Sequence, residues 1–208
     1  KDCNIELFGL DYQAESQNVV KAKYNDKNLF KLKNTSQRYP FKSNTFDYIY
    51  SNQVFEHVED IDFLVENIQR VLKNNGINIV LYPEKNIIRE PHCLIPFVHR
   101  IRNKKIKKLI VKKFYPIFNK NNKKIIDSEI MAEYIVNFTF YRSRPEIRKA
   151  FSKKGMWVRW PIIPSYATFN IFGESFPKKN KFTILFLAIL NNLWVLWKSS
   201  LFISKKVD

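Results

Sequence analysis

Apolar runs and amphipathic stretches alternate along the first half of the chain. Runs of apolar residues bounded by polar or turn-forming residues are typical of buried strands. They predict strands at residues 4–10, 29–32, 45–50 and 77–82. Apolar positions at helical spacing predict helices at 13–24 and 61–72. This order of elements indicates an α/β fold, in which helices cover both faces of a mostly parallel sheet.

The predicted helix at 61–72 has the clearest pattern. Its apolar face is formed by Ile61, Leu64, Ile68, Val71 and Leu72. Asp60 is a suitable N-cap, because a carboxylate can accept hydrogen bonds from the free amides of the first helical turn. Asn75 and Gly76 predict a left-handed stop after the helix.

The chain divides into three predicted parts. These are an α/β core at residues 1–83, a helical insertion or cap at 84–144, and a return to the core at 145–208. The third part begins with a predicted helix at 145–154, which has proline in its first turn and Gly155 as its stop. Further strands are predicted at 156–160 and 201–204.

Positive charge is concentrated in the predicted cap. The chain has 36 Lys and Arg against 19 Asp and Glu, a net charge of +17. No acidic residue occurs from Pro91 to Ile126, and the basic residues there are Arg100, Arg102, Lys104, Lys105, Lys107, Lys108, Lys112, Lys113, Lys120, Lys123 and Lys124. The residues that can share one apolar helix face are Ile106, Leu109, Ile110, Phe114, Ile117 and Phe118. A basic amphipathic helix favours contact with a polyanion or an anionic lipid surface, and a solvated helix face is the alternative.

A second apolar stretch lies near the end of the chain. Residues 182–197 are shorter than the ~20 residues of a membrane-spanning helix and contain Asn191 and Asn192. We therefore expect either a helix peripheral to a membrane or a helix packed on the sheet, which periodicity does not distinguish. Cys3 and Cys93 have no spacing typical of zinc or of a disulfide framework, which indicates a reducing, cytoplasmic setting.

Several short motifs occur in a fixed order between residues 39 and 83. They are Tyr39-Pro40-Phe41, Phe46-Asp47, Glu56-His57-Val58, Arg70-Val71-Leu72-Lys73 and Asn74-Asn75-Gly76. In this order they resemble the middle of the class I S-adenosylmethionine-dependent methyltransferase family, of the methyltransferase type 11 kind. The resemblance covers residues 5–83 well and 145–158 more loosely. It implies a Rossmann-like three-layer sandwich, S-adenosylmethionine as cofactor and methyl transfer as the activity.

The resemblance assigns cofactor-binding roles to residues that follow the first two predicted strands. Asp11, with Tyr12 beside it, resembles the acid that binds the ribose hydroxyls of the cofactor. Thr35 and Ser36 occupy the place where the family has an acid or an amide near the adenine. Taken without the resemblance, an aspartate after a strand is more often a helix N-cap than a ligand.

At the methionine end of the cofactor, the sequence both matches the family and departs from it. Ser51 and Asn52 lie at the end of the fourth family strand, where the loop faces the methyl group. The family's first strand and Gly-rich turn bring the backbone close to the cofactor. The four glycines, none of which forms such a turn, are Gly9, Gly76, Gly155 and Gly173. We therefore expect an N-terminally truncated member of the family, and a degenerate relative that does not bind the cofactor is the alternative.

His57 and His92 are the candidate catalytic residues. Methyl transfer to a hydroxyl usually needs a base near the acceptor oxygen, and histidine titrates in a suitable range. The stretch Glu90-Pro91-His92 resembles one found after the fifth strand in methyltransferases of polysaccharide and lipid-linked sugar pathways. Packing inside the protein is the alternative for both histidines. Because the spacing of Glu90, His92 and His99 matches no metal site, no metal is predicted.

These features together predict O-methylation of a sugar or of a lipid-linked glycan. The acceptor is then a small molecule or a lipid, and the enzyme is cytoplasmic with peripheral contact to an anionic inner membrane face. RNA methylation also suits the net charge, although the sequence has no recognisable RNA-binding module. A non-catalytic, methyltransferase-like binding module is a third alternative, because the Gly-rich turn is missing.

Overall fold

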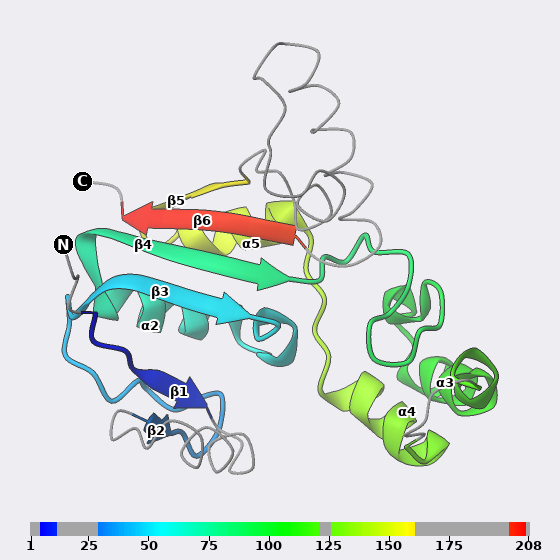
Figure 1. The fold of residues 1–208 in the computed structure, drawn as a ribbon. Helices are drawn as coiled ribbons and strands as arrows, with labels where there is room; N and C mark the ends of the chain where they lie inside the picture. The colour runs from blue at the N-terminus through cyan, green and yellow to red at the C-terminus, as the bar shows by residue number, and fades with distance from the viewer. Residues whose placement is uncertain (1–4, 12–28, 121–125, 161–199, 207–208) are drawn as a thin grey trace, which may run out of the picture.

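A computed structural model describes residues 5–11, 29–120, 126–160 and 200–206. Strands β1 (Gly9–Asp11) and β2 (Leu29–Lys31) form a small parallel sheet. Four further strands form a larger sheet in the order β3-β4-β6-β5 (Figure 1). Their bounds are Phe46–Asn52 for β3, Leu72–Tyr82 for β4, Met156–Arg159 for β5 and Ser200–Lys206 for β6.

Three of the four strands in the larger sheet run in the same direction, in agreement with the predicted mostly parallel sheet. β3 pairs with β4 in parallel, and β6 runs antiparallel to both of its neighbours, β4 and β5. The strands predicted at 29–32, 45–50, 77–82, 156–160 and 201–204 are all present. Of the strand predicted at 4–10, only the end is paired, because β1 begins at Gly9. The helices predicted at 13–24 and 182–197 lie outside the described residues.

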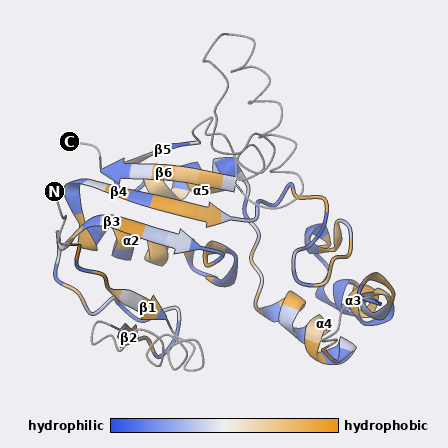
Figure 2. Cartoon of the chain, viewed as in Figure 1, coloured by the Kyte–Doolittle hydropathy of each residue, from blue (hydrophilic) through white to orange (hydrophobic). Residues whose placement is uncertain are grey.

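Two helices pack against one face of the larger sheet. α2 (Ile61–Val71) and α5 (Arg144–Ser152) lie next to each other behind β3, β4 and β6 (Figure 1). The buried core between the helices and the sheet includes Leu64, Ile68, Val80, Tyr82, Ile147, Phe151 and Phe202. The second half of β4 is strongly hydrophobic (Figure 2), which suits a strand in the middle of this core.

The predicted start of α2 is confirmed, but its predicted stop is not. Asp60 is the N-cap, and its carboxylate accepts a hydrogen bond from the Phe63 amide at 2.9 Å. The stop predicted at Asn75 and Gly76 is wrong, because the chain turns extended at Leu72 and β4 begins there. Gly76 lies within β4, and an added Cβ would come within 3.0 Å of the Phe46 carbonyl oxygen. Glycine is therefore needed at this position for the close approach of β3 and β4, and not for a left-handed turn.

The stop predicted after α5 is confirmed. Gly155 follows the helix with φ 64°, in the left-handed region that glycine adopts without strain. At the other end of α5, the Glu146 carboxylate accepts a hydrogen bond from the Ser143 amide at 2.7 Å. This contact satisfies one of the backbone donors that a helix start leaves unpaired.

The insertion after β4 forms a helical cap beyond the carboxyl ends of β3 and β4 (Figure 1). It contains the short 3-10 helix η2 (Val98–Arg100), α3 (Lys104–Phe118) and α4 (Ser128–Asn137). The cap has its own buried cluster, which includes Cys93, Ile95, Val98, Val111, Tyr115, Met131, Ala132 and Ile135. In the described part of the chain, no helix is both long enough and apolar enough to cross a membrane.

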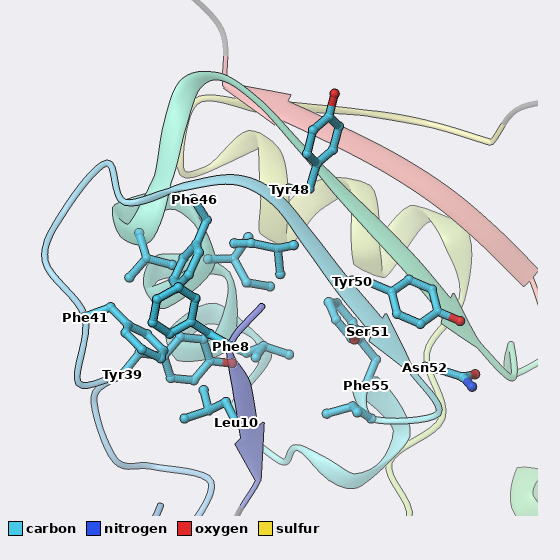
Figure 3. A pocket seen from close by; sticks show the side chains of 15 residues that line it. Phe8, Leu10, Tyr39, Phe41, Phe46, Tyr48, Tyr50, Ser51, Asn52 and Phe55 are labelled. Carbon is cyan, nitrogen blue, oxygen red and sulfur yellow. The ribbon is translucent and has the colours of Figure 1, made fainter. Parts of the chain in front are cut away.

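A gap separates the small sheet from the larger one. β1 and β3 are not hydrogen-bonded neighbours, and a cavity of ≈ 220 Å³ lies between them (Figure 3). Aromatic side chains bridge the sheets, with ring centroids 4.8–6.3 Å apart, and they are Phe8, Phe30, Phe41 and Phe46. We expect this gap to be the place where a further parallel strand, such as the first family strand, would pair with both β1 and β3.

The tight packing at Gly76 can be tested by Gly76→Ala. A methyl group there would lie 2.7 Å from Leu72 Cδ1 and 3.0 Å from the Phe46 carbonyl oxygen. We expect the free energy of unfolding to fall by about 1–3 kcal/mol, which is the usual cost of overpacking. Urea unfolding followed by circular dichroism measures it. Asn75→Ala, at an exposed position of the same strand, is the control, and an equal loss in both variants would contradict the steric reason.

Candidate functional site

A cavity of ≈ 370 Å³ lies at the carboxyl ends of β1 and β3 and reaches the cap. Its volume is in the range of small-molecule sites, and this edge of a parallel sheet is where such folds bind ligands. Four of the predicted site residues line it together: Asp11, Thr35, Asn52 and His57. The other lining residues are Leu10, Leu32, Tyr39, Gln53, Val54, Val58, Leu64 and Tyr134.

The small sheet brings Asp11 and Thr35 to the cavity. The Asp11 carbonyl oxygen accepts a hydrogen bond from the Leu32 amide at 2.8 Å, which continues the pairing of β1 and β2 past their ends. A tight turn follows, in which the Ser36 amide donates to Asn34 Oδ1 at 3.0 Å. This turn directs Thr35 into the cavity, whereas Ser36 is not among the lining residues. Tyr12 lies outside the described residues.

Helix α2 fixes the turn at residues 39–41 beside the cavity. Asn67 Oδ1 accepts a hydrogen bond from the Tyr39 amide at 2.9 Å. The Arg70 guanidinium donates to the carbonyl oxygens of Tyr39 and Phe41 at 2.8 and 2.5 Å. The Tyr-Pro-Phe and Arg-Val-Leu-Lys motifs of the resemblance are therefore in direct contact.

The end of β3 brings two further predicted residues to the site. Asn52 lines both the site cavity and the neighbouring gap between the sheets, whereas Ser51 lines only the gap (Figure 3). The Ser51 hydroxyl is buried and has no hydrogen-bond partner among the described residues. The next residue, Gln53, has φ 55°, and its amide donates to the Leu81 carbonyl at 2.8 Å. A non-glycine residue in this conformation marks the sharp turn by which the chain leaves β3.

His57 lies on the 3-10 helix η1 (Phe55–His57), which Arg142 holds in place. The Arg142 guanidinium donates to the carbonyl oxygens of Phe55, Val58 and Glu59 at 2.6–2.8 Å. No pattern in the sequence predicts this role, because all three carbonyl partners lie more than eighty positions away. Arg142 thus fixes the position of the loop that carries His57.

The hydrogen bonds of His57 define which nitrogen faces the cavity. Nδ1 lies 2.8 Å from the Phe138 carbonyl oxygen and therefore carries the proton. Nε2 is left as an acceptor, 3.5 Å from the Tyr134 hydroxyl and 3.8 Å from Glu56 Oε1. Burial, together with the positive charge of His92, lowers the pKa of His57, so that it stays neutral at neutral pH.

His92 forms a close pair with Glu90. Its Nδ1 lies 2.7 Å from Glu90 Oε1, and Oε2 of the same carboxylate accepts from the amides of His92 and Cys93 at 2.7 and 2.6 Å. Tyr141 also donates to Glu90. Burial opposes ionisation of Glu90, but its hydrogen bonds from His92, Tyr141 and the Cys93 amide outweigh burial and lower its pKa. Burial also opposes protonation of His92, but the hydrogen bond and charge of Glu90 outweigh it and raise the pKa of His92.

The two candidate catalytic histidines are neighbours, although they are distant in sequence. The ring centroids of His57 and His92 are 5.2 Å apart, and Tyr134 contacts both rings. His92 itself is not among the residues that line the cavity. His99 is different, since its Nε2 contacts the Lys85 carbonyl oxygen at 3.0 Å and its side chain packs inside the cap. Among the described residues, no group of three acidic, histidine or cysteine side chains could hold a metal ion.

Glu56 is a buried acid next to this cluster. It is 1% exposed, and neither carboxylate oxygen has a hydrogen-bond partner among the described residues. Burial raises its pKa to about 7, an effect that the charge of Glu90 reinforces and the charge of His92 opposes. The motif therefore contains an acid that keeps its proton to neutral pH, which the sequence did not reveal.

The residues of the cavity fit the nucleoside half of S-adenosylmethionine. Asp11 offers a carboxylate at a strand end, which suits the two ribose hydroxyls, and it lies beside the apolar side chains of Leu10 and Leu32. Val54 and Leu64 add apolar surface against which an adenine ring can pack. The described residues contain no Gly-rich turn for the methionine half.

The protonation of Glu56 can be tested by its effect on stability. The folded state keeps the proton to about pH 7, whereas the ordinary value is 4.5, so the wild type loses stability as the pH rises through this interval. Glu56→Gln cannot ionise. The free energy of unfolding of Glu56→Gln minus that of the wild type should therefore be about 1–3 kcal/mol larger at pH 8 than at pH 4.5. Urea unfolding at both pH values measures this, and a pH-independent difference would rule out the buried proton.

Comparison with known proteins agrees with the fold. Residues 1–80 match the model of a protein family described as a methyltransferase domain. The structure is similar to an S-adenosylmethionine-dependent methyltransferase from Mesorhizobium loti, with 13% identity, a TM-score of 0.55, and coverage of 96% of this chain and 79% of that one. It is also similar to the complex of the Haloferax volcanii Trm112 methyltransferase activator with a methyltransferase, with 17% identity, a TM-score of 0.50, and coverage of 97% and 72%. No curated protein matches the sequence significantly.

The methyltransferase-domain match and the shared fold agree with the motifs of residues 39–83. The Mesorhizobium loti protein is S-adenosylmethionine-dependent. Residues 1–80 thus match a methyltransferase domain, and the described residues share the fold of the Mesorhizobium loti methyltransferase.

Proposed function

We propose that this chain is part of an S-adenosylmethionine-dependent methyltransferase that acts on a hydroxyl oxygen of a sugar or of a lipid-linked glycan, with His92 as the base. The observation that carries the proposal is the Glu90–His92 pair, which lies beside the cavity that contains Asp11. A carboxylate that holds Nδ1–H fixes the ring and stabilises the imidazolium that forms when Nε2 takes a proton.

Four residues of this chain hold the cofactor in the proposal. When bound, S-adenosylmethionine supplies an electrophilic methyl group on its sulfonium. Asp11 accepts hydrogen bonds from the ribose hydroxyls, and Thr35 lies on the adenine side of the cavity. Asn52 and Ser51, which lie at the end of β3 (Figure 3), are assigned to the methionine side in the proposal. From the sequence, Tyr12 and Ser36 are further candidates for cofactor contact.

The two histidines have different tasks. His92 Nε2 would take the proton of the acceptor hydroxyl as that oxygen bonds to the methyl carbon and the sulfur–methyl bond breaks, leaving S-adenosylhomocysteine; Glu90 would balance the new positive charge. His57 stays neutral, and its Nε2 lone pair can accept a hydrogen bond that positions the acceptor in the cavity. The cap covers this side of the cavity with Tyr134, which helps to exclude water.

The class of acceptor is proposed from the cap. The Glu-Pro-His stretch and the basic, apolar insertion suit an acceptor attached to a lipid or carried at an anionic surface, at the cytoplasmic face of a membrane. RNA is the second candidate, because Lys and Arg of the cap could contact phosphates. A tRNA affinity that falls steeply with salt, without affinity for lipid vesicles, would favour RNA.

The cofactor contact is tested by calorimetry with S-adenosylhomocysteine. Two proteins are compared: the wild-type chain with any residues encoded upstream of it, and the same protein with Asp11→Ala. We expect micromolar binding that Asp11→Ala weakens about tenfold or more, a loss of about 1.4 kcal/mol. Asp62→Ala, which removes an exposed acid that pairs with Lys153, is the control and should bind as wild type. Absence of binding by every form would make the chain a non-catalytic relative.

The role of the Glu90–His92 pair is tested by an NMR titration of the His92 ring. Glu90→Gln removes the charge that raises the pKa of His92, so this pKa should fall. His92 acts as a base only when neutral. In Glu90→Gln, the acidic limb of the plot of kcat against pH should therefore move to lower pH, and kcat itself should drop. We expect His92→Gln to lower kcat by about 10²–10⁴. A lower kcat with an unmoved limb in Glu90→Gln would indicate a purely structural role for Glu90.

A further inference from the structure

One side of α3 is apolar and exposed. Ile106, Leu109 and Ile117 are 50%, 66% and 64% exposed. They lie within one half of the helix surface, since positions three, four, seven and eight apart share a side. The residues that α3 buries against α4 are instead Val111 and Tyr115, on the opposite side. The apolar face predicted from the sequence therefore exists, but its outer part, at Ile106, Leu109 and Ile117, faces away from the described remainder of the chain.

The lysines of α3 fall into two groups. Lys108 pairs with Glu129 and Glu133 of α4, and Lys112 pairs with Glu129 at 2.6 Å. A second group has no ion pair within the described residues, and it consists of Lys104, Lys105, Lys107 and Lys113. Within this second group, Lys105 and Lys113 lie on the same side of the helix as the exposed apolar stripe, because successive helical residues are about 100° apart. The acids of the cap thus neutralise the side of α3 that packs on α4 and leave the outer side basic.

The outer side of α3 is rigidly connected to the site. Val111 packs with Cys93 and Val98, which follow His92 in the chain. Asn119, at the end of α3, donates to the Cys93 carbonyl oxygen at 2.8 Å. On the other side, α4 packs on α3 and carries Tyr134 into the cavity. A surface that holds α3 would therefore hold the His92 loop and the mouth of the site near it.

We propose that the stripe of Ile106, Leu109 and Ile117, with its flanking lysines, binds the surface of an anionic lipid membrane. This surface deepens the proposed function and rests on it for the acceptor. Aliphatic side chains enter the boundary between headgroups and acyl chains, while lysines beside them contact anionic headgroups. An RNA ligand would use the lysines but would gain nothing from three exposed aliphatic side chains, since RNA stacks on aromatic rings or is bound through phosphate. Figure 2 shows hydrophobic and hydrophilic residues around the turns of α3.

The test is co-sedimentation with vesicles of phosphatidylcholine alone and of phosphatidylcholine mixed with phosphatidylglycerol. The wild type should bind the mixed vesicles at low salt and lose binding as salt rises. The double variant Leu109→Ser, Ile117→Ser should bind at least tenfold more weakly. The matched control is Ile5→Ser, Leu7→Ser, which removes two side chains of similar exposure, 75% and 69%, at the other end of the molecule. Equal binding by wild type and the Leu109, Ile117 variant would overturn the proposal.

Two further measurements separate this surface from the catalytic proposal. Circular dichroism should show unchanged helix content in both double variants, because all four side chains are exposed. S-adenosylhomocysteine affinity should also be unchanged in both, since none of the four lines the site cavity. If the wild type bound tRNA but no vesicles, and the Leu109→Ser, Ile117→Ser variant lost tRNA binding, the partner of this surface would be RNA and not a membrane. Vesicle binding by a protein that does not bind S-adenosylhomocysteine would keep the surface and reject the catalytic proposal.

Discussion

The hydrogen bonds of Arg142 connect the core, the cap and the candidate site. The guanidinium joins the chain that returns from α4 to the carbonyl oxygens of η1 and the residues after it. The backbone takes part as well, since the Lys85 amide donates to the Arg142 carbonyl oxygen at 3.0 Å and the Phe140 amide donates to Glu56. Both connections between core and cap therefore meet beside His57. A charged donor that satisfies several buried carbonyls is costly to replace, because each would lose its partner.

Around this anchor, two acids of one small cluster take opposite protonation states. The Glu90 carboxylate accepts hydrogen bonds from His92, Cys93 and Tyr141 and ionises easily, whereas the Glu56 carboxylate accepts none from the described residues and keeps its proton. The histidines next to them differ in the same way, because His92 is paired with the charged Glu90, whereas the shortest hydrogen bond of His57 is to the neutral Phe138 carbonyl oxygen. Environment, rather than residue type, thus distinguishes the proposed base from the neutral histidine beside it.

In the cap, the apolar pattern predicted the helix correctly but did not determine which side of that helix would be buried. Apolar residues at helical spacing predicted α3 and an amphipathic surface, but they did not indicate which side would face α4. The packing of Val111 and Tyr115 against Met131 and Ile135 settles that side. The remaining apolar side chains are left outside, where water, lipid or another molecule must cover them.

Local pattern in the sequence determined the strands and helices of the core, the cap of α2 at Asp60 and the turn at Gly155. Such features depend on residues a few positions apart, so they can be read from spacing alone. Tertiary structure decided the rest: the meeting of Asp11, Asn52 and His57 in one cavity, the place of Gly76 between two strands, and the anchoring by Arg142. These depend on contacts between residues far apart in the chain. The same holds for the pKa of Glu56, because burial is a property of the folded protein and not of a motif.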